Sequence, residues 1–251
     1  MKKLMAANWK MYKTAGEAEK TARELVALLS GKIPVDREVL VAPPFTAIGA
    51  VAGAFSGKAG YHLAGQNFYP SGQGAFTGEI APEMLLDLGC DFALAGHSER
   101  RHVMGESDAM IGRKTAFGLE AGLSIILCVG ETLPERKAGQ VEAVLTAQLE
   151  AGLAGVDKGL DPDRLAVAYE PVWAIGSGLT AGPKEIAEAH LFVRELLGSI
   201  LGQTGPKTRI LYGGSVKPEN CGEIIRIDNV DGVLVGGASL SAKSFSEIVL
   251  A

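Results

Sequence analysis

Residues 165–201 read LAVAYEPVWAIGSGLTAGPKEIAEAHLFVRELLGSIL and carry the signals of a strand, a loop and a helix in turn. The first five residues form an unbroken apolar run, which is typical of a parallel strand buried on both faces. Apolar residues then recur at helical spacing from Ile186 to Leu201, and Pro183 stands where a helix favours proline. The Gly-Ser-Gly at residues 176–178 suits neither helix nor strand. This stretch therefore predicts a strand–loop–helix unit.

The same unit recurs along the chain. The other strand candidates are KLMAAN (3–8), EVLVAP (38–43), YHLAGQN (61–67), FALAGH (92–97), SIILCVG (124–130), TRILYGG (208–214) and GVLVGG (232–237). Helical patterns separate them and are clearest over residues 15–29, 108–122 and 141–153, with Ser107 as a candidate helix cap. About eight such pairs in 251 residues predict an α/β fold, a single (β/α)8 TIM barrel that occupies residues 1–251 as one domain.

A doubly wound open sheet is the alternative to the barrel. Such a sheet needs fewer strands, and a Gly-x-Gly-x-x-Gly usually follows its first strand. Here the first strand runs into NWKMY at residues 8–12, which contains no glycine. No linker or change in composition divides the chain, so the barrel is the favoured prediction.

Composition argues against several classes of partner. The formal net charge is −5, and no run of Lys and Arg is long enough for a nucleic-acid or membrane surface. No apolar run approaches the roughly 18 residues of a membrane-spanning helix. Only residues 4–7 are continuously apolar near the start, which is too short for the core of a secretion signal. We expect a cytoplasmic protein with no nucleic-acid or membrane partner.

The cysteines and histidines do not form a metal-binding pattern. Cys90, Cys128 and Cys221 are far apart, so we expect buried free thiols rather than disulfides or zinc ligands. His102 follows His97 by five residues, which places the two on different faces of a helix. We therefore expect no bound metal.

Polar residues interrupt the apolar runs where each strand ends. These residues are Asn8, Lys10, Gln66, Asn67, His97, Ser98, Glu99, Glu170, Gly213, Gly214, Ser215, Gly236 and Gly237. Active sites of (β/α)8 barrels lie at the carboxyl ends of the strands. The repetition of this pattern favours an active site over a set of unrelated surface residues.

Glu170, His97 and Lys10 are the candidates for acid–base chemistry. Taken alone, Glu170 is better explained as a surface carboxylate and His97 as a buried structural histidine. The apolar residues that follow Glu170 would remove water from it, and desolvation makes a carboxylate a better proton acceptor. Lys10 lies between Trp9 and Met11, so partial burial would require an anionic partner, either Glu99 or a substrate phosphate.

Two glycine turns and one apolar loop complete the predicted site. The turns in YGGSV and VLVGGAS follow the seventh and eighth strands, where free backbone amides of barrel enzymes often bind phosphate. A plain tight turn is the alternative for each. The apolar loop after Glu170 is interpreted as a lid that closes over a phosphate and excludes water.

Six motifs between Asn8 and Leu240 resemble those of one enzyme family. They are NWKM, GAFTGE, AGHSERR, AYEPVWAIGSG, YGGSV and VDGVLVGGASL. In this order they resemble the triosephosphate isomerases, which interconvert dihydroxyacetone phosphate and D-glyceraldehyde 3-phosphate in glycolysis and gluconeogenesis. The resemblance implies a phosphosugar substrate, proton transfer through an enediolate and no cofactor.

The resemblance also implies a role for each catalytic residue. Glu170 takes a proton from the carbon beside the carbonyl. His97, kept neutral, polarises the carbonyl and moves a proton between the two oxygens of the enediolate. Lys10 supplies positive charge, Asn8 supplies a hydrogen bond, and Glu99 supports both Lys10 and His97.

Substrate phosphate and lid residues follow from the same resemblance. The phosphate would be bound by Gly176, Ser215, Gly236 and Gly237. The lid would comprise Pro171, Val172, Trp173, Ala174, Ile175, Gly176, Ser177 and Gly178. The loop Gly72–Glu79 would cross into a partner subunit of a homodimer, with Phe76 and Thr77 as contacts and Thr77 bracing the neighbour's Asn8 and Lys10.

Three positions depart from the family pattern. Leu179 replaces a lysine after the lid, Tyr12 replaces an asparagine and Ala81 replaces a serine. None of them carries the reaction chemistry, so we expect the family's reaction; the sequence does not predict the lid kinetics.

Two other functions compete with this interpretation. A Schiff-base aldolase on the same fold would need a lysine in the sixth strand, and LAVAYEP has none. A non-catalytic phosphosugar-binding protein would be favoured by the loss of Glu170 or His97, and both are present.

Overall fold

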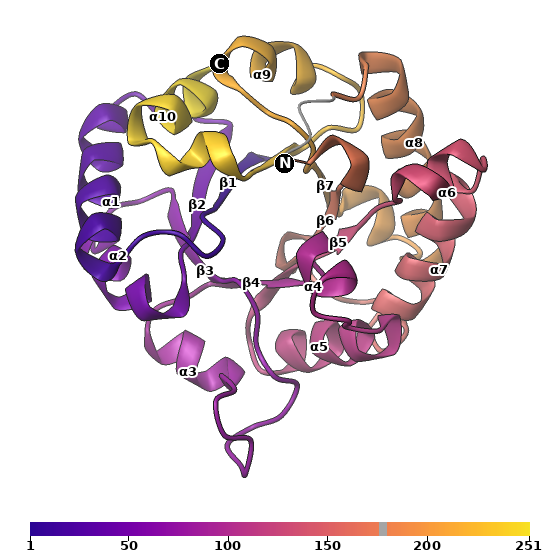
Figure 1. Ribbon diagram of the computed structural model, residues 1–251, viewed down its shortest axis with the longest axis horizontal. Helices are drawn as coiled ribbons and strands as arrows, with labels where there is room; N and C mark the ends of the chain where they lie inside the picture. Colours follow the sequence, from indigo (N-terminus) through magenta and orange to yellow (C-terminus); the bar gives the residue numbers. More distant parts are fainter. Residues whose placement is uncertain (176–179) are drawn as a thin grey trace.

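The computed structural model describes residues 1–175 and 180–251, and its strands close into one parallel barrel (Figure 1). Neighbouring strands follow one another in chain order, and β1 pairs with β8 to complete the ring. The strands are β1 Lys3–Asn8, β2 Arg37–Ala42, β3 Tyr61–Gly65, β4 Phe92–Ala95, β5 Ser124–Val129, β6 Leu165–Tyr169, β7 Arg209–Tyr212 and β8 Gly232–Val235. The predicted (β/α)8 barrel is confirmed, and the open-sheet alternative is excluded.

Helices surround the barrel on its outside (Figure 1). They are α1 Ala15–Leu29, α2 Ile48–Phe55, α3 Pro82–Asp87, α4 Ser98–His102, α5 Asp108–Glu120, α6 Leu133–Lys137, α7 Val141–Leu153, α8 Pro183–Leu201, α9 Pro218–Ile224 and α10 Ala242–Leu250. Local sequence explains their ends: the Ser107 side chain caps α5 by accepting from the Met110 N–H, and Pro183 opens α8.

The central residues of the strands are apolar because both faces of the sheet are buried. In β1, Leu4 and Ala6 point into the barrel, where they belong to a buried cluster with Leu40, Leu94 and residues of the other strands. Met5 and Ala7 point outward and join the larger core between strands and helices. Both faces are packed with apolar side chains over the middle of the strands, and the polar residues are concentrated at the strand ends.

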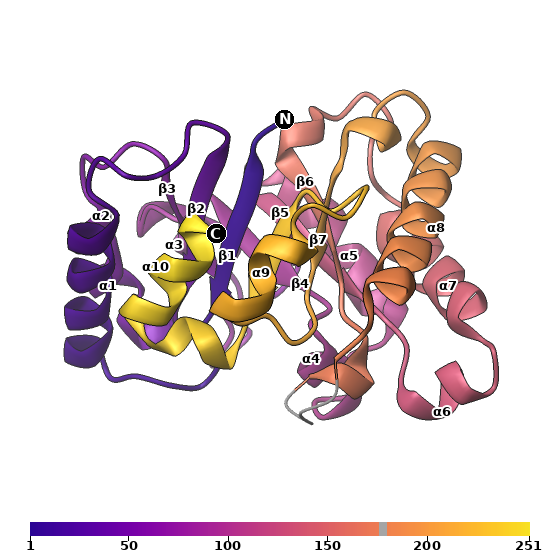
Figure 2. The same ribbon diagram turned by 90° about the horizontal axis from the view of Figure 1, so that it is seen from above.

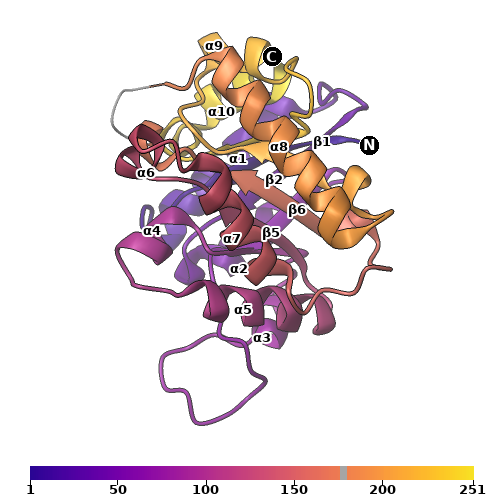
Figure 3. The ribbon, with the colours of Figure 1, turned by 90° about the vertical axis from the view of Figure 1, so that its right-hand side faces the viewer.

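The two ends of the barrel differ in the segments that lie there. In a view from the side, α4 and α6 lie at one end and the N-terminus at the other (Figure 2). The first of these ends holds the carboxyl termini of the strands. The segment between β3 and α3 extends beyond the rest of the molecule (Figure 3). Within residues 1–175 and 180–251, no helix is both long and apolar enough to cross a membrane.

Candidate active site

A cavity of about 340 Å³ opens at the carboxyl ends of the strands. Its lining includes most of the residues predicted from sequence: Asn8, Lys10, His97, Glu170, Ser215, Gly236 and Gly237. Glu99 stands beside it and contacts Lys10 and His97. Gly176, the remaining predicted phosphate ligand, lies outside the described residues. The barrel therefore brings together groups that are more than 200 positions apart in the chain.

Glu170 follows β6 and is almost fully buried, with 2% of its surface exposed. Its Oε2 accepts a hydrogen bond from the Ser98 backbone N–H at 2.9 Å, and its Oε1 lies 3.1 Å from His97 Nε2. Glycines on the two neighbouring strand ends allow this position, since a Cβ on Gly130 would lie 1.8 Å from the Glu170 carbonyl oxygen. Glu170 is thus a buried carboxylate whose oxygens face the amino-terminal end of α4 and the imidazole.

His97 occupies the N-cap position of α4 and is 5% exposed. The backbone N–H of Glu99 donates to His97 Nδ1 at 3.3 Å. In the neutral ring this contact leaves the proton on Nε2, the nitrogen that faces Glu170. The ring therefore presents a donor toward the carboxylate and the cavity.

Lys10 is held in an unusual conformation. Its φ is +51°, in the left-handed region that side-chain-bearing residues rarely adopt. Its Nζ donates to Glu99 Oε1 at 2.9 Å, and its N–H donates to Asn8 Oδ1 at 3.0 Å. Of the two anionic partners expected for Lys10, the structure shows Glu99.

The turns after β7 and β8 form the wall of the cavity opposite His97. Residues Gly213, Gly214 and Ser215 line it after β7, and Gly236 and Gly237 after β8. A Cβ on Gly236 would lie 3.2 Å from the Lys10 Cε, so this turn passes close beside the lysine stem. Small residues here let backbone amides approach an anion closely.

Cys128 lies within the barrel beneath the site and is fully buried. Burial raises the pKa of its thiol well above the usual value, and the charge of Glu170 raises it further. Cys90 and Cys221 are also buried free thiols. The expectation of buried free cysteines is confirmed, and Cys128 is a protonated packing residue rather than a nucleophile.

The described part of the predicted lid, residues 171–175, is tied to β5. A short 3-10 turn spans Val172–Ala174, and Trp173 donates through Nε1 to Glu131 Oε1 at 2.8 Å. The Arg136 guanidinium lies 4.8 Å from the Trp173 ring centroid. Ile175 lines the cavity, whereas Gly176, Ser177, Gly178 and Leu179 lie outside the described residues.

Sequence reasoning missed Glu131, the partner of Trp173. This carboxylate is fully buried and also accepts from the Tyr169 hydroxyl at 3.2 Å. The available signal was its position, because Glu131 follows the fifth apolar run as Glu170 follows the sixth. Tyr12 and Lys217, which line the cavity rim, were also not assigned to the site. Lys217 could have been found as the basic residue directly after YGGSV.

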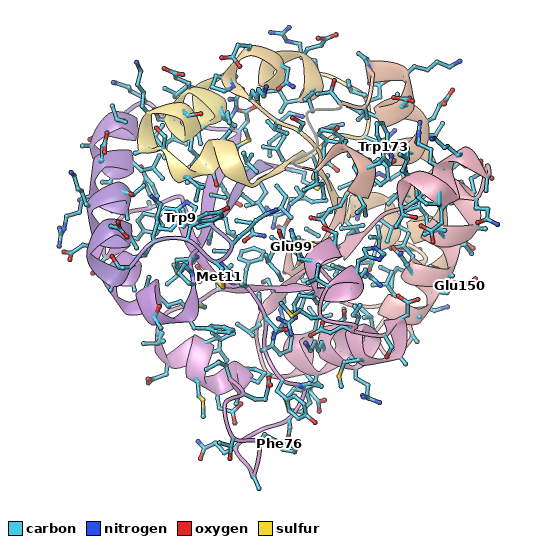
Figure 4. The ribbon with its side chains drawn as sticks, in the orientation of Figure 1. Trp9, Met11, Phe76, Glu99, Glu150 and Trp173 are labelled. Carbon is cyan, nitrogen blue, oxygen red and sulfur yellow. The ribbon has the colours of Figure 1, made fainter. Side chains whose placement is uncertain are left out.

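Phe76 and Thr77 lie far from the cavity within their own chain. Both are exposed, and Figure 4 shows Phe76 on the projecting segment. The Phe76 ring packs against Tyr69, with 4.4 Å between ring centroids, yet 42% of the residue is exposed. The structure therefore places an aromatic side chain on an extended loop without burying it.

Comparison with known proteins identifies a matching family and several relatives. The family model described as triosephosphate isomerase matches residues 3–251. Triosephosphate isomerases of Nitratidesulfovibrio vulgaris (strain Miyazaki F) and Oleidesulfovibrio alaskensis are 62% and 61% identical, with all of both chains covered in each case. That of Chloroflexus aurantiacus is 50% identical, and the match covers 98% of this chain and 97% of the relative.

Proposed function

The chain belongs to the triosephosphate isomerase family, and from this premise we propose how its own residues perform the reaction. The enzyme interconverts dihydroxyacetone phosphate and D-glyceraldehyde 3-phosphate, a reaction of glycolysis and gluconeogenesis. We treat residues 1–251 as one catalytic domain, because β1 and β8 pair across the whole length of the chain. The proposal concerns the role of each side chain in that domain.

Glu170 is the base that moves the proton between carbons. Its carboxylate takes a proton from the carbon next to the carbonyl of the substrate, giving an enediolate, and returns a proton to the adjacent carbon. Both carboxylate oxygens have polar partners, Ser98 N–H and His97 Nε2. Glu170 must exchange these contacts for the substrate carbon when the cavity is filled.

His97 acts on the oxygens while Glu170 acts on the carbons. Its Nε2–H donates to the carbonyl oxygen as negative charge develops there, and Nε2 then accepts the proton of the neighbouring hydroxyl. Lys10 places a positive charge beside this oxygen, and the Asn8 amide donates a hydrogen bond. Such groups act by stabilising charge that appears only in the transition state.

The observation that carries this proposal is the contact between Glu170 and His97 inside the cavity. A buried carboxylate and an imidazole Nε2 lie 3.1 Å apart, and the Lys10 ammonium is held by Glu99 beside them. A carboxylate base and a proton donor side by side in one small cavity suit the transfer of protons at neighbouring carbon and oxygen atoms.

The phosphate is bound by backbone amides of Ser215, Gly236 and Gly237, with Gly176 of the lid as the fourth ligand. The cavity wall formed by the β7 and β8 turns supports this assignment. The lid, Pro171 to Gly178, closes over the bound phosphate and keeps water from the enediolate. No metal or organic cofactor is needed for these steps.

The protein acts as a cytoplasmic homodimer. Exposed Phe76 on the projecting loop supports the dimer, since a large aromatic ring in water is unfavourable. In the assembly Phe76 and Thr77 pack against the partner, and Thr77 braces the partner's active-site loop. The absence of a membrane-spanning helix among the described residues is compatible with a cytoplasmic enzyme.

Replacing Glu170 by Gln tests the proposal. The amide keeps the size of the side chain but cannot accept the proton, so kcat should fall by roughly 10²–10⁴-fold or more. KM should change much less, because the phosphate-binding turns are untouched. Glu150→Gln, an exposed position on α7 (Figure 4), makes the same chemical change far from the cavity and should keep full activity. All assays contain a metal chelator. A Glu170→Gln enzyme with nearly unchanged kcat would remove Glu170 from the mechanism.

A further inference from the structure

Gln66 follows β3 among the polar residues at the strand ends, and no step of the proposed reaction uses it. We propose that Gln66 is a positioning residue for Lys10, and that it acts by fixing the backbone of Lys10 in its left-handed conformation. The inference rests on the proposed catalytic role of Lys10. It concerns a residue that is not in the lining of the cavity.

Two side chains hold the backbone of Lys10 from either side. Asn8 Oδ1 accepts from the Lys10 N–H at 3.0 Å, and Gln66 Nε2 donates to the Lys10 carbonyl oxygen at 2.8 Å. The two hydrogen bonds hold the N–H and the carbonyl oxygen of the residue whose φ is +51°. A lysine adopts such a conformation only where its surroundings determine it, and here the surroundings are these two amides.

Gln66 also ties the Lys10 loop to the barrel. The second proton of Nε2 goes to the Ala42 carbonyl oxygen at 2.9 Å, at the end of β2. The same oxygen accepts from the Trp9 N–H at 3.0 Å, just beyond the last residue of β1. One carboxamide therefore joins the ends of three neighbouring strands at the point where the chain turns into Lys10.

Gln66 itself stands on a rigid support. The next residue, Asn67, is buried, and its Oδ1 accepts from Lys114 Nζ at 2.6 Å. Lys114 is in turn paired with Glu106. Phe68, the residue after Asn67, is fully buried. The carboxamide of Gln66 is thus attached to a fixed segment and can impose its geometry on Lys10.

The backbone of Lys10 decides where its ammonium lies. The side chain runs past the Gly236 turn to Glu99, with Nζ 2.9 Å from Glu99 Oε1. Figure 4 shows Glu99 near the centre of the view, with Trp9 and Met11, the neighbours of Lys10, to its left. A change of the Lys10 φ would redirect the whole side chain. A misplacement of about 1 Å can cost a reaction about a hundredfold.

A double-mutant cycle tests this inference. The four proteins are wild type, Gln66→Met, Lys10→Ala and the double variant, assayed for kcat/KM with glyceraldehyde 3-phosphate. Met has a similar length to Gln but donates no hydrogen bond. Gln66→Met should lower kcat/KM about ten- to a hundredfold in wild type and less than about twofold in the Lys10→Ala background.

Thr204→Val is the matched control. The Thr204 hydroxyl lies within hydrogen-bond distance of two carbonyl oxygens, those of Lys158 and Leu160, at 2.8 and 3.2 Å. Thr204 precedes β7, so this bridge is at the end of the barrel away from the cavity. Thr204→Val should lower the melting temperature but leave kcat/KM unchanged. If Gln66→Met does not fold, Gln66→Asn, with a shorter carboxamide, replaces it in the same cycle.

Two results would overturn the inference. The first is no loss of kcat/KM in the Gln66 variants. The second is an equal loss with and without Lys10, which would mean that Gln66 does not act through the lysine. If Lys10→Ala alone kept full activity, the proposed role of Lys10 would fail first, and the inference with it. The Lys10→Ala variant therefore tests the proposed role of Lys10, and the double variant tests whether Gln66 acts through it.

Discussion

At the scale of single residues, position in the barrel separates the proposed base, Glu170, from a second buried carboxylate, Glu131. Glu170 and Glu131 both follow an apolar strand and both are buried, yet Glu170 faces His97 whereas Glu131 holds Tyr169 and Trp173. Sequence patterns singled out Glu170 at the end of the sixth strand but not Glu131 at the end of the fifth. They do not predict the partner of each acid, because the partners come from other strands and the barrel must close before they meet.

His190 illustrates a titratable residue that the reaction does not use. It is fully buried on α8, between the rings of Tyr169 and Tyr212, and its Nδ1 lies 2.9 Å from the Asn229 carbonyl oxygen. Burial lowers its pKa from 6.5 to about 4, although Asp231 nearby opposes this. The unfolded chain therefore binds a proton at this site before the folded protein does, as the pH falls from 6.5 to about 4.

His190 should make the protein less stable in mild acid. Its contribution is complete above pH 6.5 and is lost as the pH falls toward 4, so it should lower the free energy of unfolding by about 2 kcal/mol between pH 7 and pH 5. Urea unfolding at several pH values measures this. In His190→Asn, where the amide can replace the bond to Asn229, that part of the pH dependence should vanish. Parallel curves for the two proteins would contradict the assignment.

At the scale of elements, long periodic segments were predictable and short ones were not. Residues 15–29 and 141–153 were expected as helices, and α1 and α7 have these bounds. The helix α4 spans only Ser98–His102, too few residues for a periodic pattern; His97 caps it, and the Ser98 N–H at its amino-terminal end donates to Glu170. Hydrophobic periodicity therefore could not predict the element that carries Glu99.

The proposed lid is the element whose removal should change the products. An enediolate with a phosphate on the next carbon can expel the phosphate and give methylglyoxal. Deleting residues 175–178 leaves Glu170 and His97 in place, so proton abstraction should survive in weakened form while isomerisation falls further. Methylglyoxal and inorganic phosphate released per isomerised product should rise relative to wild type.

A single substitution tests the apolar cover of this loop without shortening the loop. Ile175 lines the cavity, and Ile175→Ala keeps the length of the loop while removing part of the apolar cover. Its ratio of methylglyoxal to isomerised product should lie between those of wild type and the deletion. An unchanged ratio in both variants would mean that the loop does not guard the intermediate.

At the scale of the whole molecule, closure of the barrel explains both what the sequence predicts and what it does not. Eight apolar runs with polar ends indicate a barrel with a site at one end, and β1 meets β8 as that requires. The projecting loop with Phe76 was expected to contact a partner subunit, and in the single chain Phe76 is exposed. The support of Lys10 by Gln66 could not be predicted, because it depends on a backbone angle that no sequence pattern specifies.

The projecting loop should make the active enzyme a homodimer. Sedimentation at micromolar concentration should show a dimer for wild type. Phe76→Asp should shift it toward monomer and lower activity, because a charge would be buried against the partner. Leu191→Asp, at a position on α8 that is 49% exposed, introduces the same charge elsewhere and should remain dimeric. A fully active wild-type monomer under these conditions would refute the dimer.

The most direct test of proton transfer by Glu170 follows hydrogen during the reaction. Wild-type enzyme isomerises glyceraldehyde 3-phosphate in D₂O with a chelator present, and the carbon-bound deuterium of the dihydroxyacetone phosphate is measured by NMR. A proton held by the Glu170 carboxyl can exchange with solvent before it is returned, so the product should carry deuterium on the carbon that received it. A product that contains no carbon-bound deuterium would mean that the hydrogen passes between the carbons without exchanging with solvent, and it would contradict the account.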